Sequence, residues 1–317
     1  MNLDRIRAAH ERIAPHVHVT PTFSATLLGA AAGVQVFLKG ESLQKTGSFK
    51  VRGALNAVLT LDAAARARGV VTVSAGNHAQ ALAWAGRTAG VACTVVMPTG
   101  ASRAKVDASL AYGAEVVLHG ASSIEAFVRA HELEHERRLT FISPFDDEEV
   151  MAGAGTVGLE LLEQVPNLDA VVVPIGGGGL IAGMAAAIKA LDPRVRIFGV
   201  EPEGAPSMRR SLDAGRAVRL DAVRTIADGL AAPMAGDLTF PIVRDLVDDV
   251  VLVGDDDIAR AVGATLTFAK LLAEPAGAAA TAAILSGKLP LRAGARVASV
   301  LSGGNVDLAR LRDVLSR

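Results

Sequence analysis

The sequence has one cysteine, no excess of charge of either sign and no long apolar run. Cys93 is the only cysteine among 317 residues, so no intrachain disulfide can form, as is usual in the reducing cytoplasm. Lysine plus arginine number 32 against 33 acids, which argues against a nucleic-acid or anionic membrane partner. Glycines and charges interrupt every apolar run before it reaches the length of a membrane span, and the N-terminus has no apolar signal core. We therefore expect a globular cytoplasmic protein.

Half of the residues are apolar, which is enough for a sizeable core. Short runs rich in valine and isoleucine alternate with alanine-rich segments of helical length. This pattern predicts an α/β fold with parallel sheets and helices on both faces. The expected strands are residues 70–73, 93–97, 114–118, 139–143, 170–175, 195–200, 248–253 and 296–301.

Two stretches, residues 43–53 and 143–156, are candidate crossings between two lobes. We expect residues 1–53 and 144–317 to form a large domain, and residues 54–143 to form a smaller α/β domain inserted into it.

Four glycines follow the expected strand of the stretch "VVVPIGGGGLIAG" and precede a helical pattern. Gly176, Gly177, Gly178 and Gly179 let several backbone N–H groups converge on one anion at the positive end of that helix. A flexible turn would not need four glycines, because each adds to the entropy lost on folding. The loop therefore predicts a phosphate site.

The loop alone does not show which ligand carries the phosphate. Gly177, Gly179 and Ala182 satisfy the G-x-G-x-x-A pattern, and Glu201 lies about twenty residues further on. This spacing is also typical of dinucleotide binding, so a nicotinamide-dependent oxidoreductase is an alternative.

Two more strand ends are small and polar. In "VTVSAGNHAQ", the residues Ser74, Gly76 and Asn77 can hold a carboxylate at a helix N-terminus, although capping by Ser74 or Asn77 explains them equally well. His78 is interpreted mainly as a capping or packing residue. The stretch "LSGGN" follows the last expected strand, and such strand ends converge on one crevice of a parallel sheet.

The stretch "KTGSFKVRGA" places a lysine at the start of a helix. Apolar residues at 51, 54, 55, 58 and 59 predict the helix, and Ser48 is its expected N-cap, so Lys50 falls in the first turn. The helix N-terminus and partial burial both disfavour an ammonium there and lower the pKa of the lysine. An uncharged lysine amine is a nucleophile toward aldehydes. A lysine lying along the surface is the alternative, but it fits this position poorly.

Nine motifs occur together and in order: "SLQKTGSFKVRGA", "SAGNHAQ", "PFDD", "GTVGLEL", "GGGGL", "EPEGA", "ADGLA", "AEPAGAAA" and "LSGGN". The chain resembles the fold-type II pyridoxal-phosphate enzymes, the tryptophan synthase β-subunit-like group, from about residue 20 to 310. Within that group it most resembles the serine/threonine ammonia-lyases (threonine dehydratases) and the serine racemases.

This resemblance implies pyridoxal 5'-phosphate as cofactor, with Lys50 as the catalytic residue that forms the Schiff base. The cofactor contacts that it implies are Phe49, Asn77, Gly176, Gly177, Gly178, Gly179, Gly229, Glu274 and Ser302, with Asn77 on the phenolic oxygen and Ser302 on the pyridine nitrogen. The implied substrate contacts are Ser74, Ala75, Gly76, Asn77 and His78.

The implied reaction is β-elimination from a small hydroxy amino acid, with L-threonine giving 2-oxobutanoate, L-serine giving pyruvate, and ammonia released. Related racemases carry a serine at the position of Ala75, whose methyl group has no proton to give, so we expect little racemisation. A serine racemase, a 3-hydroxyaspartate dehydratase and a cofactor-binding protein without activity are the alternatives.

A metal is not expected. Metal-dependent relatives carry a second carboxylate after "EP", where this chain has Ser207, so Glu201, the Ala205 carbonyl and Ser207 form at most a weak cation site. The stretch "HELEH" at residues 131–135 has zinc-ligand spacing, but its neighbours indicate a solvated helix face. The resemblance further implies a homodimer or homotetramer, and we expect no C-terminal regulatory domain.

Overall fold

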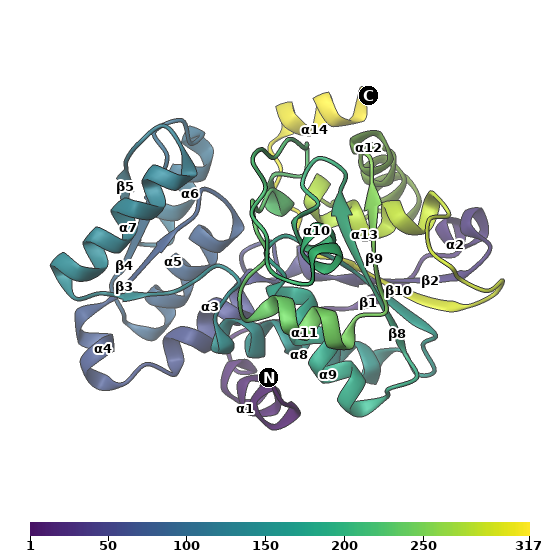
Figure 1. The fold of residues 1–317 in the computed structure, drawn as a ribbon, viewed down its shortest axis with the longest axis horizontal. Coiled ribbons are helices and arrows are strands. Elements are labelled where there is room, and N and C mark those ends of the chain that lie inside the picture. The colour runs from purple at the N-terminus through teal and green to yellow at the C-terminus, as the bar shows by residue number, and fades with distance from the viewer.

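The computed structural model describes residues 1–317 and contains two separate sheets (Figure 1). The larger sheet has the strand order β1-β2-β10-β7-β8-β9 and the smaller one β5-β4-β3-β6. The strands are β1 (Thr22–Ser24), β2 (Gln35–Gly40), β3 (Val70–Val73), β4 (Cys93–Met97), β5 (Glu115–Leu118), β6 (Thr140–Phe141), β7 (Ala170–Pro174), β8 (Arg196–Pro202), β9 (Asp249–Val253) and β10 (Arg296–Leu301).

All eight expected strands are present, but the sequence analysis missed β1 and β2. Strand β2 contains the fully buried Lys39, which breaks the apolar run by which the other strands are recognised. Strand β1 has only three residues, and it pairs antiparallel with β2 at the edge of the large sheet. The expected parallel pairing holds for every other strand pair of the two sheets.

Fourteen α-helices connect and cover the sheets. They are α1 (Leu3–Ile13), α2 (Thr26–Ala32), α3 (Lys50–Leu59), α4 (Ala63–Arg68), α5 (Asn77–Ala89), α6 (Arg103–Ala111), α7 (Ser123–Arg137), α8 (Glu148–Gln164), α9 (Gly179–Leu191), α10 (Ser207–Ala214), α11 (Thr239–Leu246), α12 (Asp255–Ala264), α13 (Pro275–Leu285) and α14 (Leu308–Leu315). No helix is both long enough and apolar enough to cross a membrane.

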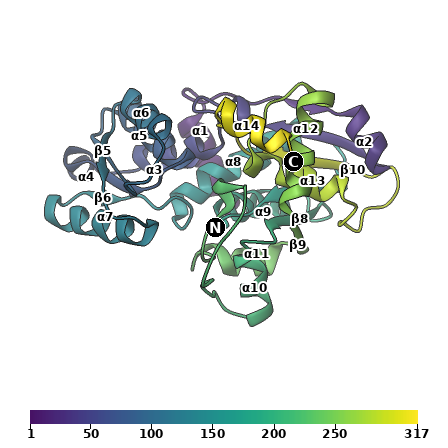
Figure 2. The ribbon, with the colours of Figure 1, turned by 90° about the horizontal axis from the view of Figure 1, so that it is seen from above.

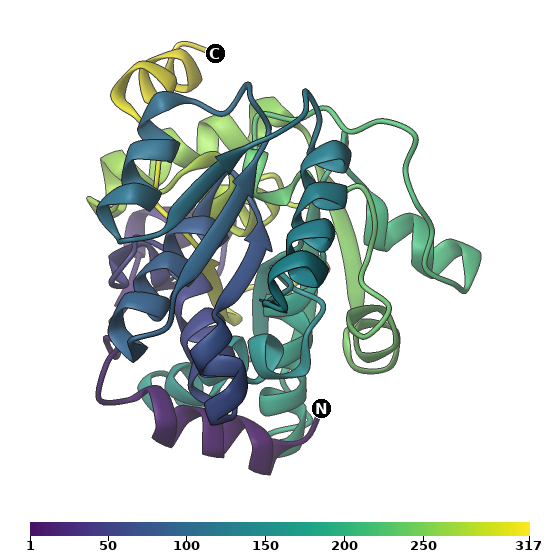
Figure 3. The same cartoon turned by 90° about the vertical axis from the view of Figure 1, so that its left-hand side faces the viewer.

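Helices cover both faces of each sheet, as the apolar strands require. In the large lobe, α8, α9 and α11 pack on one face, and α2, α12 and α13 on the other (Figure 2). In the small lobe, α3 and α5 pack on one face and α7 on the other (Figure 3). The predicted α/β fold is confirmed.

Helices α3 and α8 lie between the two sheets (Figure 1). They cross so closely that a Cβ atom added to Gly53 would lie 2.5 Å from the Val150 carbonyl oxygen, and one added to Gly153 would clash with the Arg52 carbonyl. Only glycine permits this approach. The small sheet comes entirely from residues between β2 and β7, but the expected boundary after residue 53 falls inside α3, so the domain limits stay a prediction.

Candidate active site

The candidate site lies where the strand order of each sheet reverses. In the large sheet, β10 returns to lie between β2 and β7, so the segments after β7 and β10 begin side by side. In the small sheet, β3 has β4 on one side and β6 on the other. Crevices at such reversals, outside the carboxyl ends of parallel strands, are the usual ligand sites of open α/β sheets.

The glycine loop after β7 presents free donors. The backbone N–H groups of Gly176, Gly177, Gly178 and Gly179 donate to no acceptor of the protein, and Gly178 has a φ of 100°. The loop leads into the N-terminus of α9, where the helix dipole favours an anion. This arrangement fits a phosphate group.

Contacts from three segments hold the loop in shape. The Thr239 hydroxyl donates to the Gly177 carbonyl at 2.7 Å, and the Phe145 ring lies where a side chain on Gly177 would be. Asp146 accepts from the backbone N–H groups of Leu238 (2.9 Å) and Thr239 (3.3 Å). Sequence reasoning gave the "PFDD" residues no role in shaping the loop, and it missed Thr239, which no local motif marks.

Gly229 lies beside the glycine loop, and its contact with the cofactor stays a prediction. A Cβ atom on Gly176 would lie 3.2 Å from the Gly229 carbonyl oxygen, and one on Gly229 would lie 2.9 Å from the Ala276 Cβ. A larger residue at either position would press against these neighbours.

Lys50 is the first residue of α3 and is half-buried. Its Nζ donates to the Pro144 carbonyl at 2.5 Å and lies 5.0 Å from the centroid of the Phe49 ring. Burial lowers the pKa of Lys50 to about 8, and no carboxylate opposes this shift. Because Pro144 precedes Phe145, the amine and the glycine loop are linked through two adjacent residues.

The expected N-cap of α3 is wrong. Phe49, not Ser48, is the N-cap residue, and it provides no side-chain cap. Ser48 instead joins Gly303 in an antiparallel bridge, and its buried hydroxyl has no hydrogen-bond partner. The first turn of α3 therefore has no side-chain N-cap.

Ser302 follows β10 and is 5% exposed. Its carbonyl accepts from the backbone N–H of Phe49 at 3.0 Å, so Ser302 lies beside the start of α3. A Cβ atom on the neighbouring Gly303 would lie 3.1 Å from Asn77 Nδ2 and would clash with Glu274. These contacts bring together Phe49, Ser302, Asn77 and Glu274, which are far apart in the sequence.

Asn77 does not cap α5, whose N-cap is Gly76. Its Nδ2 donates to Glu274 Oε1 at 2.5 Å, while its Oδ1 accepts from Asn305 Nδ2 at 2.8 Å. Burial raises the pKa of Glu274 to about 7, although the bond from Asn77 opposes the shift. Asn305 joins this network as the last residue of the "LSGGN" motif, but sequence reasoning gave it no role.

The loop after β3 is compact. The Ser74 hydroxyl accepts from the Gly76 N–H at 3.1 Å, and Ala75 lies between them without a polar side chain. His78 is buried with its Nε2 3.3 Å from the Ile142 carbonyl oxygen, and burial, with a smaller contribution from Lys50, lowers its pKa to about 3. The interpretation of His78 as a packing residue fits this position, and substrate contacts from the loop stay a prediction.

The weak cation site is already used by the protein. Glu201 is fully buried, and its two carboxylate oxygens accept from the backbone N–H groups of Met208 (2.7 Å) and Arg209 (2.8 Å) at the start of α10. The Ser207 hydroxyl lies 3.3 Å from the same carboxylate, beside the buried Ala205. No group of three metal-ligating side chains occurs in the structure. Glu201 is also unavailable to a ribose, which argues against the dinucleotide alternative.

The "HELEH" stretch lies on α7. His131 Nδ1 lies 2.7 Å from Glu134, and the ring stacks on Phe141 with centroids 4.5 Å apart. Arg129 pairs with Glu132 and Glu136 on the same helix, which fits the predicted solvated face.

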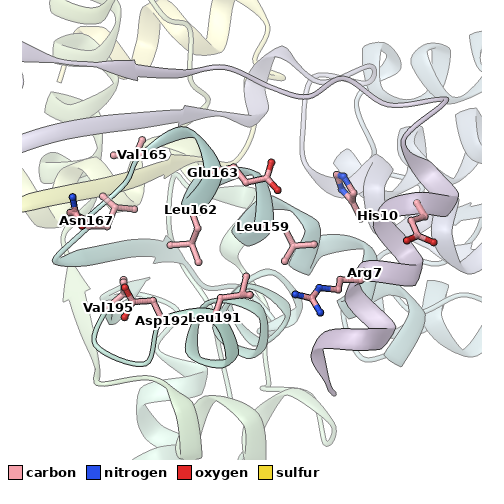
Figure 4. Close-up of a pocket in the computed structure, with 12 residues that line it drawn as sticks. Arg7, His10, Leu159, Leu162, Glu163, Val165, Asn167, Leu191, Asp192 and Val195 are labelled. Atoms are coloured by element: carbon pink, nitrogen blue, oxygen red, sulfur yellow. The ribbon is translucent and has the colours of Figure 1, made fainter.

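A surface hollow of about 460 Å³ lies away from the candidate site (Figure 4). Val195 of its lining immediately precedes β8, and only Asp169 separates Leu168 from β7, so the hollow opens at the opposite end of the sheet from the glycine loop. The rest of its lining comes from α1, from the C-terminal ends of α8 and α9, and from the residues that follow these two helices.

A family model described as pyridoxal-phosphate dependent enzyme matches residues 13–303. The chain belongs to this family. L-threonine ammonia-lyase of Thermotoga maritima is 43% identical over 317 residues, which cover 100% of this chain and 79% of that relative. Serine racemase of Arabidopsis thaliana is 45% identical, covering 97% and 94% of the two chains.

Among solved structures, maize serine racemase superposes with a TM-score of 0.95 at 42% identity, covering 99% of this chain and 97% of that one. The crevice of this pyridoxal-phosphate-dependent enzyme fits the cofactor, since it combines free N–H donors for a phosphate with a lysine amine that has no counter-ion.

Proposed function

We propose that this pyridoxal-phosphate-dependent enzyme is an ammonia-lyase that acts on small hydroxy amino acids, most readily L-threonine and L-serine. The observation that carries this proposal is the Lys50 amine, which has a pKa of about 8 and is linked through Pro144 and Phe145 to the glycine loop. The Thermotoga maritima relative, an L-threonine ammonia-lyase, supports the reaction class.

The glycine loop and the N-terminus of α9 would hold the cofactor phosphate. When bound, the cofactor supplies an electron-withdrawing ring that makes the α-proton of an amino acid removable. Lys50 then has two duties, namely covalent attachment of the cofactor and transfer of that proton as a general base. A pKa near 8 leaves an appreciable share of the amine uncharged at neutral pH.

Two neutral or protonatable groups complete the proposed site. Ser302 would contact the ring nitrogen with a hydroxyl, which does not stabilise a charge there as a carboxylate would. Glu274, with a pKa near 7, would be partly protonated and able to donate a hydrogen bond from its place beside Asn77. The loop of Ser74 to His78 would bind the substrate carboxylate at the start of α5.

Loss of the β-hydroxyl gives an enamine product that hydrolyses to a 2-oxo acid and ammonia. Racemisation would require a second acid to return a proton on the opposite face, and the methyl group of Ala75 cannot do so. The 45% identity to a serine racemase makes racemisation the second candidate function.

Incubating the holoenzyme with a panel of amino acids tests both functions. We expect 2-oxobutanoate from L-threonine, pyruvate from L-serine, equal amounts of ammonia and little D-serine. D-serine accumulating as fast as pyruvate would favour the racemase function. If no hydroxy amino acid gave a product, the proposed ammonia-lyase activity would be wrong.

The setting and assembly are part of the same proposal. A cytoplasmic location is supported by Cys93, which is buried and forms no disulfide. Burial raises the pKa of its thiol to about 12, so the thiol stays protonated. A homodimer or homotetramer is proposed from the family resemblance, and light scattering of the purified protein measures it directly.

A further inference from the structure

Four fully or almost fully buried charges lie next to the candidate site, on the other side of α3. Lys39 and Arg52 carry two positive charges, and Glu41 and Glu160 carry two negative ones, so the cluster is neutral. Lys39 comes from β2, Glu41 from the turn that follows β2, Arg52 from α3 and Glu160 from α8. We call these four residues the ion cluster.

The guanidinium of Arg52 is held from two sides. Its Nε and Nη2 donate to the two oxygens of Glu41 at 2.8 and 2.9 Å, while Nη1 and Nη2 donate to the two oxygens of Glu160 at 2.6 and 2.9 Å. Thr156 and the His18 carbonyl accept further bonds at 3.2 Å. The planar fork of an arginine makes two such paired contacts, and a lysine at the same place cannot.

Lys39 has a different position in the same cluster. Its Nζ donates to Glu160 Oε2 and to the Thr20 carbonyl, both at 2.7 Å, and to Gln164 Oε1 at 3.1 Å, so it makes no hydrogen bond with α3. Arg52 is thus the only cluster member on the helix that begins at Lys50.

Arg52 follows Lys50 by two residues, which turns the side chain by about 200° around the helix axis. The two side chains therefore leave α3 on nearly opposite faces. Any rotation of α3 that would move Lys50 out of the crevice has to break the paired contacts of Arg52. The close crossing of Gly53 and Gly153 sets the distance between α3 and α8 and also restrains rotation, because a neighbouring residue with a Cβ atom would clash there. The paired contacts of Arg52 add to this restraint.

Stability alone does not explain such a cluster, because apolar replacements of buried ion pairs are often as stable. We propose that Arg52 is a positioning residue, which fixes the rotation of α3 so that the Lys50 amine stays in the crevice. This inference rests on the proposed role of Lys50.

Comparing Arg52→Lys with Lys39→Met tests the proposal in the apo-protein. The pKa of the Lys50 amine is measured from the pH dependence of its labelling by acetic anhydride, read by mass spectrometry, and the rate of covalent capture of pyridoxal phosphate is followed by borohydride trapping. Circular dichroism checks the fold of each variant, and urea unfolding reports its stability.

In Arg52→Lys we expect the pKa of Lys50 to rise by about one unit, and capture at pH 7.5 to slow about tenfold, because the amine gains access to water. Lys39→Met, which loses a contact in the same cluster, should leave the pKa of Lys50 within about 0.3 units and the capture rate within about twofold of the wild type.

A folded Arg52→Lys protein with the wild-type pKa and capture rate would overturn the proposal. The proposal would also be wrong if Lys39→Met changed the Lys50 pKa and the capture rate as strongly, because any loosening of the ion cluster would then explain the effect of Arg52→Lys. If Arg52→Lys does not fold, the same two values are measured in Glu41→Gln, which keeps the Glu160 contacts of Arg52, and are compared with those of Lys39→Met. Absence of any Lys50 adduct in the wild type would instead remove the proposed function, while the labelling pKa would still test Arg52.

Discussion

Two lysines, Lys39 on β2 and Lys50 at the start of α3, are held in opposite ways. In the ion cluster, Lys39 donates to Glu160, and burial lowers its pKa while Glu160 and Glu41 oppose the shift. In the crevice, Lys50 donates only to the Pro144 carbonyl, so nothing offsets the effect of burial on its pKa. The same desolvation therefore gives a structural ion pair in one region and a reactive amine in the other.

The carboxylates of the two regions differ in the same way. Burial alone would raise the pKa of Glu160, but Arg52 and Lys39 outweigh it and hold the pKa below its usual value. Glu274 has only the amide of Asn77 as a hydrogen-bond donor, and burial raises its pKa to about 7. Counter-ions thus separate groups that maintain the fold from groups available for chemistry.

The largest expected effect comes from removing the amine of the crevice. Lys50→Ala should lower turnover of L-threonine by about 10⁴-fold or more, because both covalent attachment and proton transfer are lost. Lys39→Met, the matched control in the ion cluster, should retain turnover within about tenfold. The rate of 2-oxobutanoate release by both variants tests this prediction. Substantial turnover by Lys50→Ala would contradict the distinction between a reactive Lys50 and a structural Lys39.

Breaking the ion cluster should affect stability most. Glu160→Ala leaves Lys39 without a carboxylate contact and Arg52 with only one, and should lower the free energy of unfolding by about 4 kcal/mol. Glu148→Ala, which removes an exposed partner of Arg5, should cost less than about 1 kcal/mol. Urea unfolding at pH 7 measures both losses, and equal losses would show that burial of the pair is unimportant.

The stability of the Glu274→Gln variant relative to the wild type should increase as the pH rises. With a folded-state pKa near 7 and an ordinary value of 4.5, Glu274 binds its proton more tightly in the folded protein, so stability falls as the pH rises from 4.5 to 7. The glutamine of the variant does not titrate, so this fall in stability does not occur there. The variant's stability relative to wild type should therefore increase by up to about 3 kcal/mol between pH 5 and pH 8. A stability difference that does not change with pH would argue against the raised pKa.

The pH dependence of Lys50 gives the smallest effect. With a pKa near 8, the uncharged fraction of the amine rises about tenfold between pH 7 and pH 9 and then levels off, whereas an ordinary lysine would gain about 100-fold. The rate at which apo-protein captures pyridoxal phosphate should follow the first curve. A rate that still climbs steeply above pH 9 would place Lys50 in water.

Sequence reasoning predicted most of the fold because buried parallel strands leave uninterrupted apolar runs. It failed at β2, where Lys39 breaks the run, since nothing local reveals that Glu160 would neutralise it. It likewise predicted the glycine loop and Lys50, whose signals lie within a few residues. Thr239, Asn305 and the pairing of Asn77 with Glu274 were missed because they depend on contacts between segments far apart in the chain.

The most direct test of the account is to reduce the holoenzyme with borohydride and locate the pyridoxyl group by peptide mass spectrometry. We expect the group on Lys50 alone, with Lys39 unmodified. A modified lysine elsewhere, or an unmodified Lys50 in protein saturated with pyridoxal phosphate, would contradict the claim that the lysine without a counter-ion is the one that binds the cofactor.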